Sequence, residues 1–530
     1  MTASDLEDKP QLELPTDSKE RFVVETAVQD SVGSDDVNVN PTYDLALKYL
    51  VEHEGKYAPL NEKEHKGAVR KTDRILLPIL FFTATMGAVD KVCLGTTAIF
   101  GLIKDNNLHG QQYSWLGSIL FIGSLVGMWP MTYLLQHFRM GKVMSCCSLI
   151  WSVLSLLHCA CHNFAGLAAL RFLMGFVECA IVPGCGLMIA SFYLKNESPH
   201  RTALVFMFAS SVINGALSAL ATTFGNEIPT WKYIFILVGS VSFVWSLFIT
   251  WYLPDSPINA KWLSERQRYH MVKRVADNAT GVQCNYFKWS QVWEAFADPR
   301  VYIVMLFNFG INIPNGGLSA FSSIIIKNLG FTSVQSSLMG IPTGVIASIS
   351  TVFFTWLASR WTNKRCLVSV ISLVIPLIGA IILYTVDRSH VGPQLLGLYL
   401  MYFYFASYIV MMSCVQANTA GSTKKSVTYG FNYLGYCGGA ITGTQTFRSD
   451  QAPKYTGGFI SILVAYCACM VLSIIYWFVS DQMNRKKKNY LEKNGIERVL
   501  PEEDERIDDI DEEKVKDLTD KQQIHFFYTT

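Results

Sequence analysis

Apolar segments as long as a lipid bilayer is thick recur along this chain of 530 residues. A helix of about 20 apolar residues spans the hydrocarbon core. Twelve segments have this character, and a polar stretch separates the first six from the last six. Only 16% of the residues are charged, against roughly 25% in soluble proteins. The sequence therefore predicts an all-α polytopic membrane protein with transmembrane helices at about 75–101, 113–136, 143–162, 164–194, 202–224, 232–253, 301–326, 333–357, 366–386, 394–416, 427–446 and 457–480.

Changes in composition divide the chain into five parts. Residues 1–69 are polar and acidic and are expected to be a disordered tail. Two pseudo-symmetric six-helix bundles follow at 70–253 and 300–480, joined by a polar loop at 254–299, and 481–530 form a second tail. Lys and Arg gather on one side of the predicted helices, which predicts that both termini and the central loop are cytoplasmic. That side carries Arg70, Lys71, Arg74, Arg139, Lys142, Arg201, Arg360, Lys364, Arg365, Lys424, Lys425 and Arg485 to Lys488.

Charged residues inside the apolar segments concentrate in two helices. The first holds Asp90 and Lys91, and the fourth holds Arg171 and Glu178. At 1.5 Å per residue, Asp90 and Glu178 each lie about 21–22 Å from the end at which their helix enters, near the middle of the membrane. Residues seven apart lie within about 20° of one face, so Arg171 and Glu178 form one stripe. The two helices are therefore predicted to present two carboxylates and two cations to one cavity.

Such a cavity suits an anion that moves together with a proton. The Arg171 fork and the Lys91 ammonium would hold a carboxylate. When the anion occupies a cation, Asp90 or Glu178 loses its counter-charge and takes up a proton more readily. The alternative is that Asp90 with Lys91, and Arg171 with Glu178, neutralise each other and only hold helices together.

Uncharged polar residues add candidate substrate contacts. Asn214 lies in the fifth predicted helix, and Asn308, Asn312 and Asn315 share one face of the seventh. We predict that Asn214, Asn312 and Asn315 bind substrate; a hydrogen bond between helices is the alternative for each. The Cys159-Ala-Cys161-His162 cluster lacks a second ligand group nearby, so we expect packing residues there and no metal.

These residues resemble a known group. The six-plus-six layout is similar to the major facilitator superfamily, and Asp90-Lys91 with Arg171 and Glu178 resemble the charged residues of its anion:cation symporter family. The stretches GQQYSWLGS at 110–118, IPNGGLSAF at 313–321 and TGTQTFRSDQAPKYTGG at 442–458 resemble its fungal allantoate permease branch. Lys91 stands where many members have Arg.

The resemblance implies a symporter that imports a small organic anion by alternating access, driven by the proton gradient and without a cofactor. Members handle allantoate and other ureido acids, small peptides, vitamins or sulfur amino acids. Carried over to this sequence, Lys91 and Arg171 engage the substrate carboxylate. Asp90 and Glu178 take the protons. The implied location is the plasma membrane, and we expect a monomer.

Other functions are weighed against this one. A nutrient sensor on the same fold would need long structured cytoplasmic extensions, whereas the tails are low in complexity. An uncoupled facilitator of the same anions would tolerate the loss of Glu178. An enzyme is not expected, because no phosphate-binding loop or metal spacing occurs in an accessible segment. No basic domain indicates nucleic acid.

Overall fold

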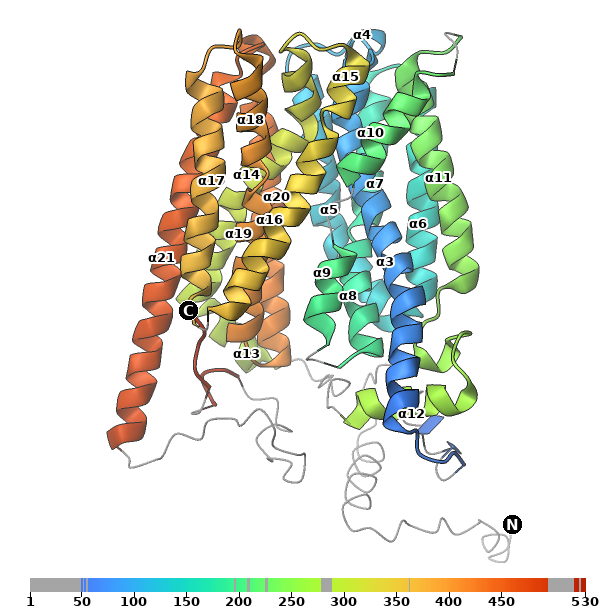
Figure 1. The fold of residues 1–530 in the computed structure, drawn as a ribbon, viewed down its shortest axis with the longest axis vertical. Helices are drawn as coiled ribbons and strands as arrows, with labels where there is room; N and C mark the ends of the chain where they lie inside the picture. The colour runs from blue at the N-terminus through green and yellow to red at the C-terminus, as the bar shows by residue number, and fades with distance from the viewer. Residues whose placement is uncertain are drawn as a thin grey trace, which may run out of the picture.

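The chain forms helices arranged in two groups side by side (Figure 1). The computed structural model describes residues 49–50, 52–53, 56–194, 197–206, 210–224, 227–277, 288–361, 363–493, 519–523 and 526–530. The first group contains α3 (Glu62–Ile99), α4 (Leu102–Asp105), α5 (Gln112–His137), α6 (Met140–Leu157), α7 (Phe164–Glu178), α8 (Ile181–Phe192), α9 (Ser198–Val205), α10 (Ser210–Ala221) and α11 (Thr230–Tyr252).

The second group follows a central segment that is itself partly helical. The central segment contains α12 (Glu265–Asp277) and α13 (Trp289–Phe296). The second group contains α14 (Pro299–Lys327), α15 (Ser333–Leu338), α16 (Ile341–Arg360), α17 (Arg365–Thr385), α18 (Val391–Met401), α19 (Tyr404–Asn418), α20 (Ser422–Thr446) and α21 (Thr456–Lys493).

All twelve predicted segments correspond to helices. Within the described ranges, ten helices or helix pairs are long and apolar enough to cross a membrane. The other two predicted segments correspond to α9 with α10, and to α20. Several predicted spans are interrupted: the segment predicted at 164–194 breaks after Glu178, ahead of Pro183, and the one at 333–357 breaks ahead of Pro342. Proline lacks the amide proton that an uninterrupted helix would bond at these places.

The ends of the chain differ from the prediction. Helix α3 begins at Glu62, inside the predicted tail, because the Glu64 carboxylate accepts a hydrogen bond from the Asn61 amide at 3.0 Å and caps the helix. Helix α21 continues to Lys493, beyond the predicted end at 480. Residues 1–48, predicted to be disordered, lie outside the described residues.

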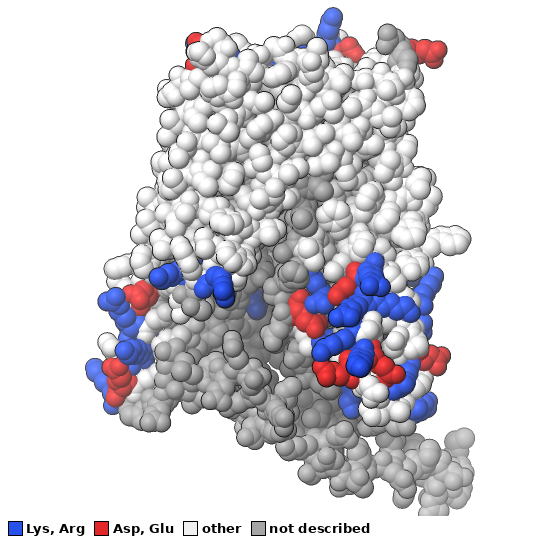
Figure 2. Space-filling model, in the orientation of Figure 1, with Lys and Arg blue, Asp and Glu red and all other residues white. Residues whose placement is uncertain are grey.

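The two ends of the helix bundle differ in charge. We call the end at which α3 begins and α21 ends the terminal face, and the other end the opposite face (Figure 1). Helices α12 and α13 lie at the terminal face. Figure 2 shows acidic and basic side chains gathered there, with an uncharged band across the middle of the molecule. Such a band suits hydrocarbon, where charged side chains are costly.

Glycines allow close helix contacts in both groups. A Cβ at Gly175 of α7 would lie 1.9 Å from the Leu120 carbonyl oxygen of α5. In the second group, a Cβ at Gly443 of α20 would lie 2.0 Å from the Ile313 oxygen of α14, and one at Gly439 would lie 2.1 Å from the Phe309 oxygen. Small residues commonly let membrane helices pack this closely. The contacts fix α7 and α14, which carry most of the predicted site residues.

Replacing Gly175 by alanine is expected to destabilise the first group. The added carbon has no space, so α5 and α7 must move apart, at a cost of about 1–3 kcal/mol or more. The thermal unfolding midpoint of the purified protein in detergent measures this. Gly186→Ala is the control, because a Cβ at that position would have no atom within 4 Å. Equal midpoints for the two variants would contradict the packing described here.

The two groups meet at the opposite face through hydroxyl and backbone contacts. The Tyr113 hydroxyl of α5 donates to the Ala320 oxygen at 2.6 Å, and Ser114 donates to the Phe447 oxygen at 3.0 Å. Lys327 and Ser333 both donate to the Ile99 oxygen, at 2.6 and 2.8 Å. Toward the terminal face the groups diverge, with α8 and α9 on one side and α13 on the other (Figure 1). The structure is therefore closed at the opposite face.

Candidate functional site

An ion pair joins α3 and α7 in the middle of the first group. The Lys91 amino group lies 3.0 Å from Glu178 Oε1, with the Lys91 side chain 25% exposed and that of Glu178 7% exposed. Gly87 lies one turn before Lys91, and a Cβ there would be 3.4 Å from the same oxygen, so α3 passes close to the carboxylate. In this structure the Lys91 amino group pairs with Glu178 and not with the neighbouring Asp90, as the alternative interpretation had it.

Asp90 and Arg171 form a second, fully buried part of the site. Asp90 Oδ1 accepts a hydrogen bond from the Ser155 hydroxyl of α6 at 2.8 Å. Arg171 donates from Nη1 to the Asp90 backbone oxygen at 3.4 Å. Asp90 Oδ2 and the Arg171 atoms Nε and Nη2 have no hydrogen-bond partner within the described parts of the chain. Buried donors and acceptors of this kind are normally satisfied, which singles out these three atoms as candidates for a functional contact.

The two cations differ in access. Arg171 is 2% exposed, whereas the Lys91 side chain is 25% exposed. Tyr436 of α20 and Tyr408 of α19 lie close enough to the Lys91 amino group to act on it electrostatically. In this state, therefore, Lys91 faces the second group and Arg171 lies behind it.

Sequence reasoning missed the tyrosines that face the ion pair. The rings of Tyr433 and Tyr436 on α20 have centroids 5.7 Å apart, and Tyr436 also packs on Phe121 of α5 at 5.9 Å. The spacing of Tyr433 and Tyr436 by three residues puts them on one helix face. That spacing was the available signal, although tyrosines in an apolar helix are commonly packing residues. Ser155, which bonds Asp90, carried no signal in the sequence.

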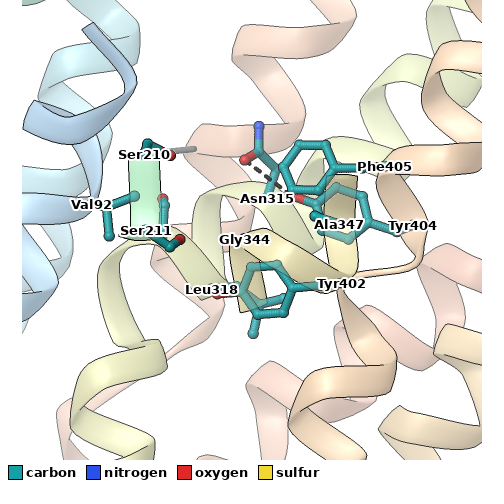
Figure 3. Close-up of a pocket in the computed structure, with 11 residues that line it drawn as sticks. Val92, Ser210, Ser211, Asn315, Leu318, Gly344, Ala347, Tyr402, Tyr404 and Phe405 are labelled. Atoms are coloured by element: carbon teal, nitrogen blue, oxygen red, sulfur yellow. Dashed lines mark hydrogen bonds between the residues drawn. The ribbon is translucent and has the colours of Figure 1, made fainter. Parts of the chain in front are cut away.

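A pocket lies beside this site, between the two helix groups (Figure 3). Val92, the residue after Lys91, contributes to its wall from α3. Figure 3 shows the Asn315 amide directed toward Tyr404, whose hydroxyl donates to Asn315 Oδ1 at 3.1 Å. Its lining is uncharged and mixes aliphatic, polar and aromatic residues: Val92, Ser210, Ser211, Asn315, Leu318, Ser319, Gly344, Ala347, Tyr402, Tyr404 and Phe405.

The predicted asparagines take different places. Asn315 lines the pocket, and its amide nitrogen donates to Asn312 Oδ1 at 3.0 Å. Asn312 itself donates to the Asn308 backbone oxygen at 2.8 Å and supports Asn315 from behind. Asn214 donates to the Thr96 hydroxyl at 2.7 Å, one turn along α10 from the pocket residue Ser210. Asn315 is thus at the pocket wall, with Asn214 and Asn312 in the layer behind it.

Comparison with known proteins identifies the family. Residues 80–444 match the model of the Major Facilitator Superfamily, and the chain belongs to that superfamily. It is 32% identical over 468 residues to the MFS-type transporter cnsL of Penicillium expansum, covering 88% of this chain and 89% of that one. It is 29% identical over 511 residues to the allantoate permease of Saccharomyces cerevisiae, covering 93% and 91% of the two chains.

Solved structures agree on the fold. A bacterial homolog of the human lysosomal transporter Spinster, in an inward-facing and unoccupied conformation, superimposes with a TM-score of 0.56 at 12% identity, covering 77% of this chain and 96% of that one. The predicted fold and the resemblance to the allantoate permease branch are confirmed. The chain is a multi-pass membrane transporter of small molecules and not an enzyme.

Proposed function

We propose that the chain is a proton-coupled symporter of a small organic anion. The observation that carries the proposal is the ion pair between Lys91 and Glu178, which joins α3 and α7 in the middle of the first helix group and leaves the Lys91 side chain 25% exposed. A substrate carboxylate that binds Lys91 competes with Glu178 for the same cation. The released Glu178 then takes a proton more readily, because a carboxylate without its counter-charge is costly in a buried place. Binding of anion and proton is thus coupled.

The remaining predicted residues take roles around this exchange. Asp90 is the second proton site, and Arg171 holds the substrate carboxylate when the opposite face opens and its free donors become accessible. Asn315 contacts the uncharged part of the substrate, with Asn214 and Asn312 contributing from the layer behind. The groups at 70–253 and 300–480 rock against each other about the pocket, as alternating access requires.

The orientation of the chain follows from its charges. Lys and Arg concentrate at the terminal face (Figure 2), and such residues favour the cytoplasmic side of a membrane. Both termini are then cytoplasmic. With this orientation, the contacts that close the opposite face support an inward-facing state. We place the protein in the plasma membrane as a monomer that imports its substrate.

The pocket favours a substrate with amide-like groups. Asn315, Tyr404, Ser210 and Ser211 offer hydrogen-bond donors and acceptors without charge. A ureido acid has a carboxylate for Lys91 and several N–H and C=O groups for these side chains. The similarity to an allantoate permease supports the same class. Peptides, vitamins and sulfur amino acids are the other candidates.

Uptake by the purified protein in liposomes tests the proposal. Labelled ureido acids, dipeptides, vitamins and thiol amino acids would each be offered with and without an inward proton gradient. We expect one class to accumulate against its gradient only when protons flow inward. Uptake that only equilibrates the substrate across the membrane, with or without the proton gradient, would instead fit an uncoupled facilitator, and tight binding without any uptake would fit a sensor.

A further inference from the structure

The end of the chain packs into the second helix group at the terminal face. We call residues 519–523 and 526–530 the C-terminal segment. Thr519 and Asp520 are fully buried, and Tyr528 is 3% exposed. The segment lies beneath α17 and α19, next to α13 (Figure 1). The sequence predicted a plain tail here, so this burial calls for a physical cause.

Charge is the first cause. Asp520 lies 2.6 Å from an Arg300 guanidinium nitrogen and 2.7 Å from the Lys424 amino group. Both cations are almost fully buried, and Asp298 also pairs with both, at 2.6 and 3.1 Å. A buried cation that loses a carboxylate partner is strongly destabilised. The contact therefore selects an acidic residue at position 520.

The aromatic ring of Tyr528 completes the charged contact. The Arg300 guanidinium carbon lies 3.9 Å from the centre of this ring, a cation–π geometry. The Tyr528 hydroxyl donates to Asp520 Oδ2 at 2.9 Å. The segment thus binds Arg300 through a carboxylate and a ring at once.

Backbone contacts hold the rest of the segment. Asn418 Nδ2 donates to the Thr529 oxygen, and Asn418 Oδ1 accepts from the Thr529 amide, each at 2.7 Å. The Lys487 amino group donates to the carbonyl oxygens of Asp520, Gln523 and Phe526, at 2.6, 3.1 and 2.8 Å. These contacts fix the path of the backbone. Glu294 of α13 accepts a further hydrogen bond from the Thr519 hydroxyl at 2.8 Å. Together with the charge contacts, these residues define a socket of Glu294, Asp298, Arg300, Asn418, Lys424 and Lys487.

The two carboxylates of the contact, Asp298 and Asp520, stay ionised over the physiological pH range. Burial alone would raise the pKa of Asp298, but Arg300 and Lys424 outweigh it and lower the pKa to about 2 from 3.8. The same two cations outweigh burial and lower the pKa of Asp520. A lowered pKa stabilises the docked form fully above 3.8, and this stabilisation is lost as the pH falls toward 2. Acidification within the physiological range therefore leaves both carboxylates charged. Burial lowers the pKa of Lys487 to about 8, so this socket cation loses its charge only as the pH rises through that value.

We propose that the socket is a binding site for the chain's own C-terminal segment, and that the docked segment braces the helices that line the pocket. The socket residues Arg300, Asn418 and Lys424 belong to α14, α19 and α20. Asn315, Tyr404 and Tyr436 belong to the same three helices. Docking therefore fixes α14, α19 and α20 at their ends on the terminal face. We expect that loss of docking slows transport without changing substrate affinity.

Hydrogen exchange of the full-length protein in detergent tests the docking. Asp520→Asn is expected to speed exchange in residues 519–530 about tenfold or more, because it removes two charge-assisted contacts. Lys521→Ala is the control, since the Lys521 side chain is exposed and lies next to Asp520 in the same segment. Equal protection in wild type and Asp520→Asn, or no protection in wild type, would overturn the proposal.

A second pair of variants tests docking without changing the buried Asp520, in case Asp520→Asn fails to fold. Lys487→Met removes the three carbonyl contacts from a half-buried position of α21, and Lys488→Met alters its exposed neighbour. We expect faster exchange of the segment and a lower maximal uptake rate with unchanged KM for Lys487→Met alone. Unchanged uptake despite lost protection would overturn the bracing role. The uptake measurement rests on the proposed function, whereas the exchange measurement does not. A failure of the docking proposal can therefore be distinguished from a failure of the proposed function.

Discussion

Replacing Glu178 by glutamine is expected to abolish proton-driven accumulation of the substrate. Wild type that couples one proton to each substrate can concentrate it about tenfold for each unit of pH difference, which corresponds to about 1.4 kcal/mol. The amide cannot take up a proton, so the concentration ratio falls to about one in the variant. Binding stays measurable, because Lys91 keeps its charge and loses its competitor.

The comparison needs an acidic residue outside the site. Asp450→Asn serves, since Asp450 is 58% exposed and pairs only with neighbouring Arg448 in the described contacts. Both variants are reconstituted in liposomes and supplied with the same pH gradient. If Glu178→Gln accumulates substrate as well as Asp450→Asn does, Glu178 is not the coupling residue.

Replacing Arg171 by alanine is expected to abolish uptake. Arg171 keeps two donor nitrogens without a partner among the described residues, while its third nitrogen donates to the Asp90 backbone oxygen. A charge-assisted contact to a substrate carboxylate contributes about 1.5–3 kcal/mol, so affinity from the outside falls at least tenfold and uptake is lost with it. Arg171→Lys keeps the charge but not the fork, and is expected to recover part of the affinity.

Two controls separate binding from folding. Arg360→Ala removes an exposed arginine at the end of α16 and should leave uptake unchanged. Thermal unfolding of Arg171→Ala shows whether the buried carboxylate of Asp90, deprived of its neighbour, weakens the fold. A well-folded Arg171→Ala protein with normal uptake would remove Arg171 from the site.

The helices were predictable because a membrane leaves few solutions. A segment of about 20 apolar residues must bond its backbone internally, and only a helix does this within one segment. The interruptions were less predictable. Pro183 and Pro342 mark two of them, but prolines such as Pro78 and Pro314 lie inside unbroken helices. Whether a proline breaks a helix depends on neighbours that are distant in sequence.

The clustering of the four charged side chains could be predicted from the sequence, but their pairing could not. The depth of Asp90, Lys91, Arg171 and Glu178 follows from counting residues. Their partners depend on how α3 is rotated, because consecutive helix residues point about 100° apart. The close passage of α3 at Gly87 sets that rotation and turns Lys91 to Glu178. The docking of Asp520 could not be predicted from the sequence either. Its partners Arg300 and Lys424 are far from it along the chain, and only the folded structure brings them together.

The pairing within the first helix group has an electrical consequence. With Asp90 and Glu178 ionised and Lys91 and Arg171 protonated, the four side chains carry no net charge. An empty carrier of this kind returns across the membrane without moving charge through the electric field. A singly charged anion that enters with one proton also adds none, so its transport is independent of the membrane voltage. A second proton would add one charge per cycle, worth about 2.3 kcal/mol for each 100 mV.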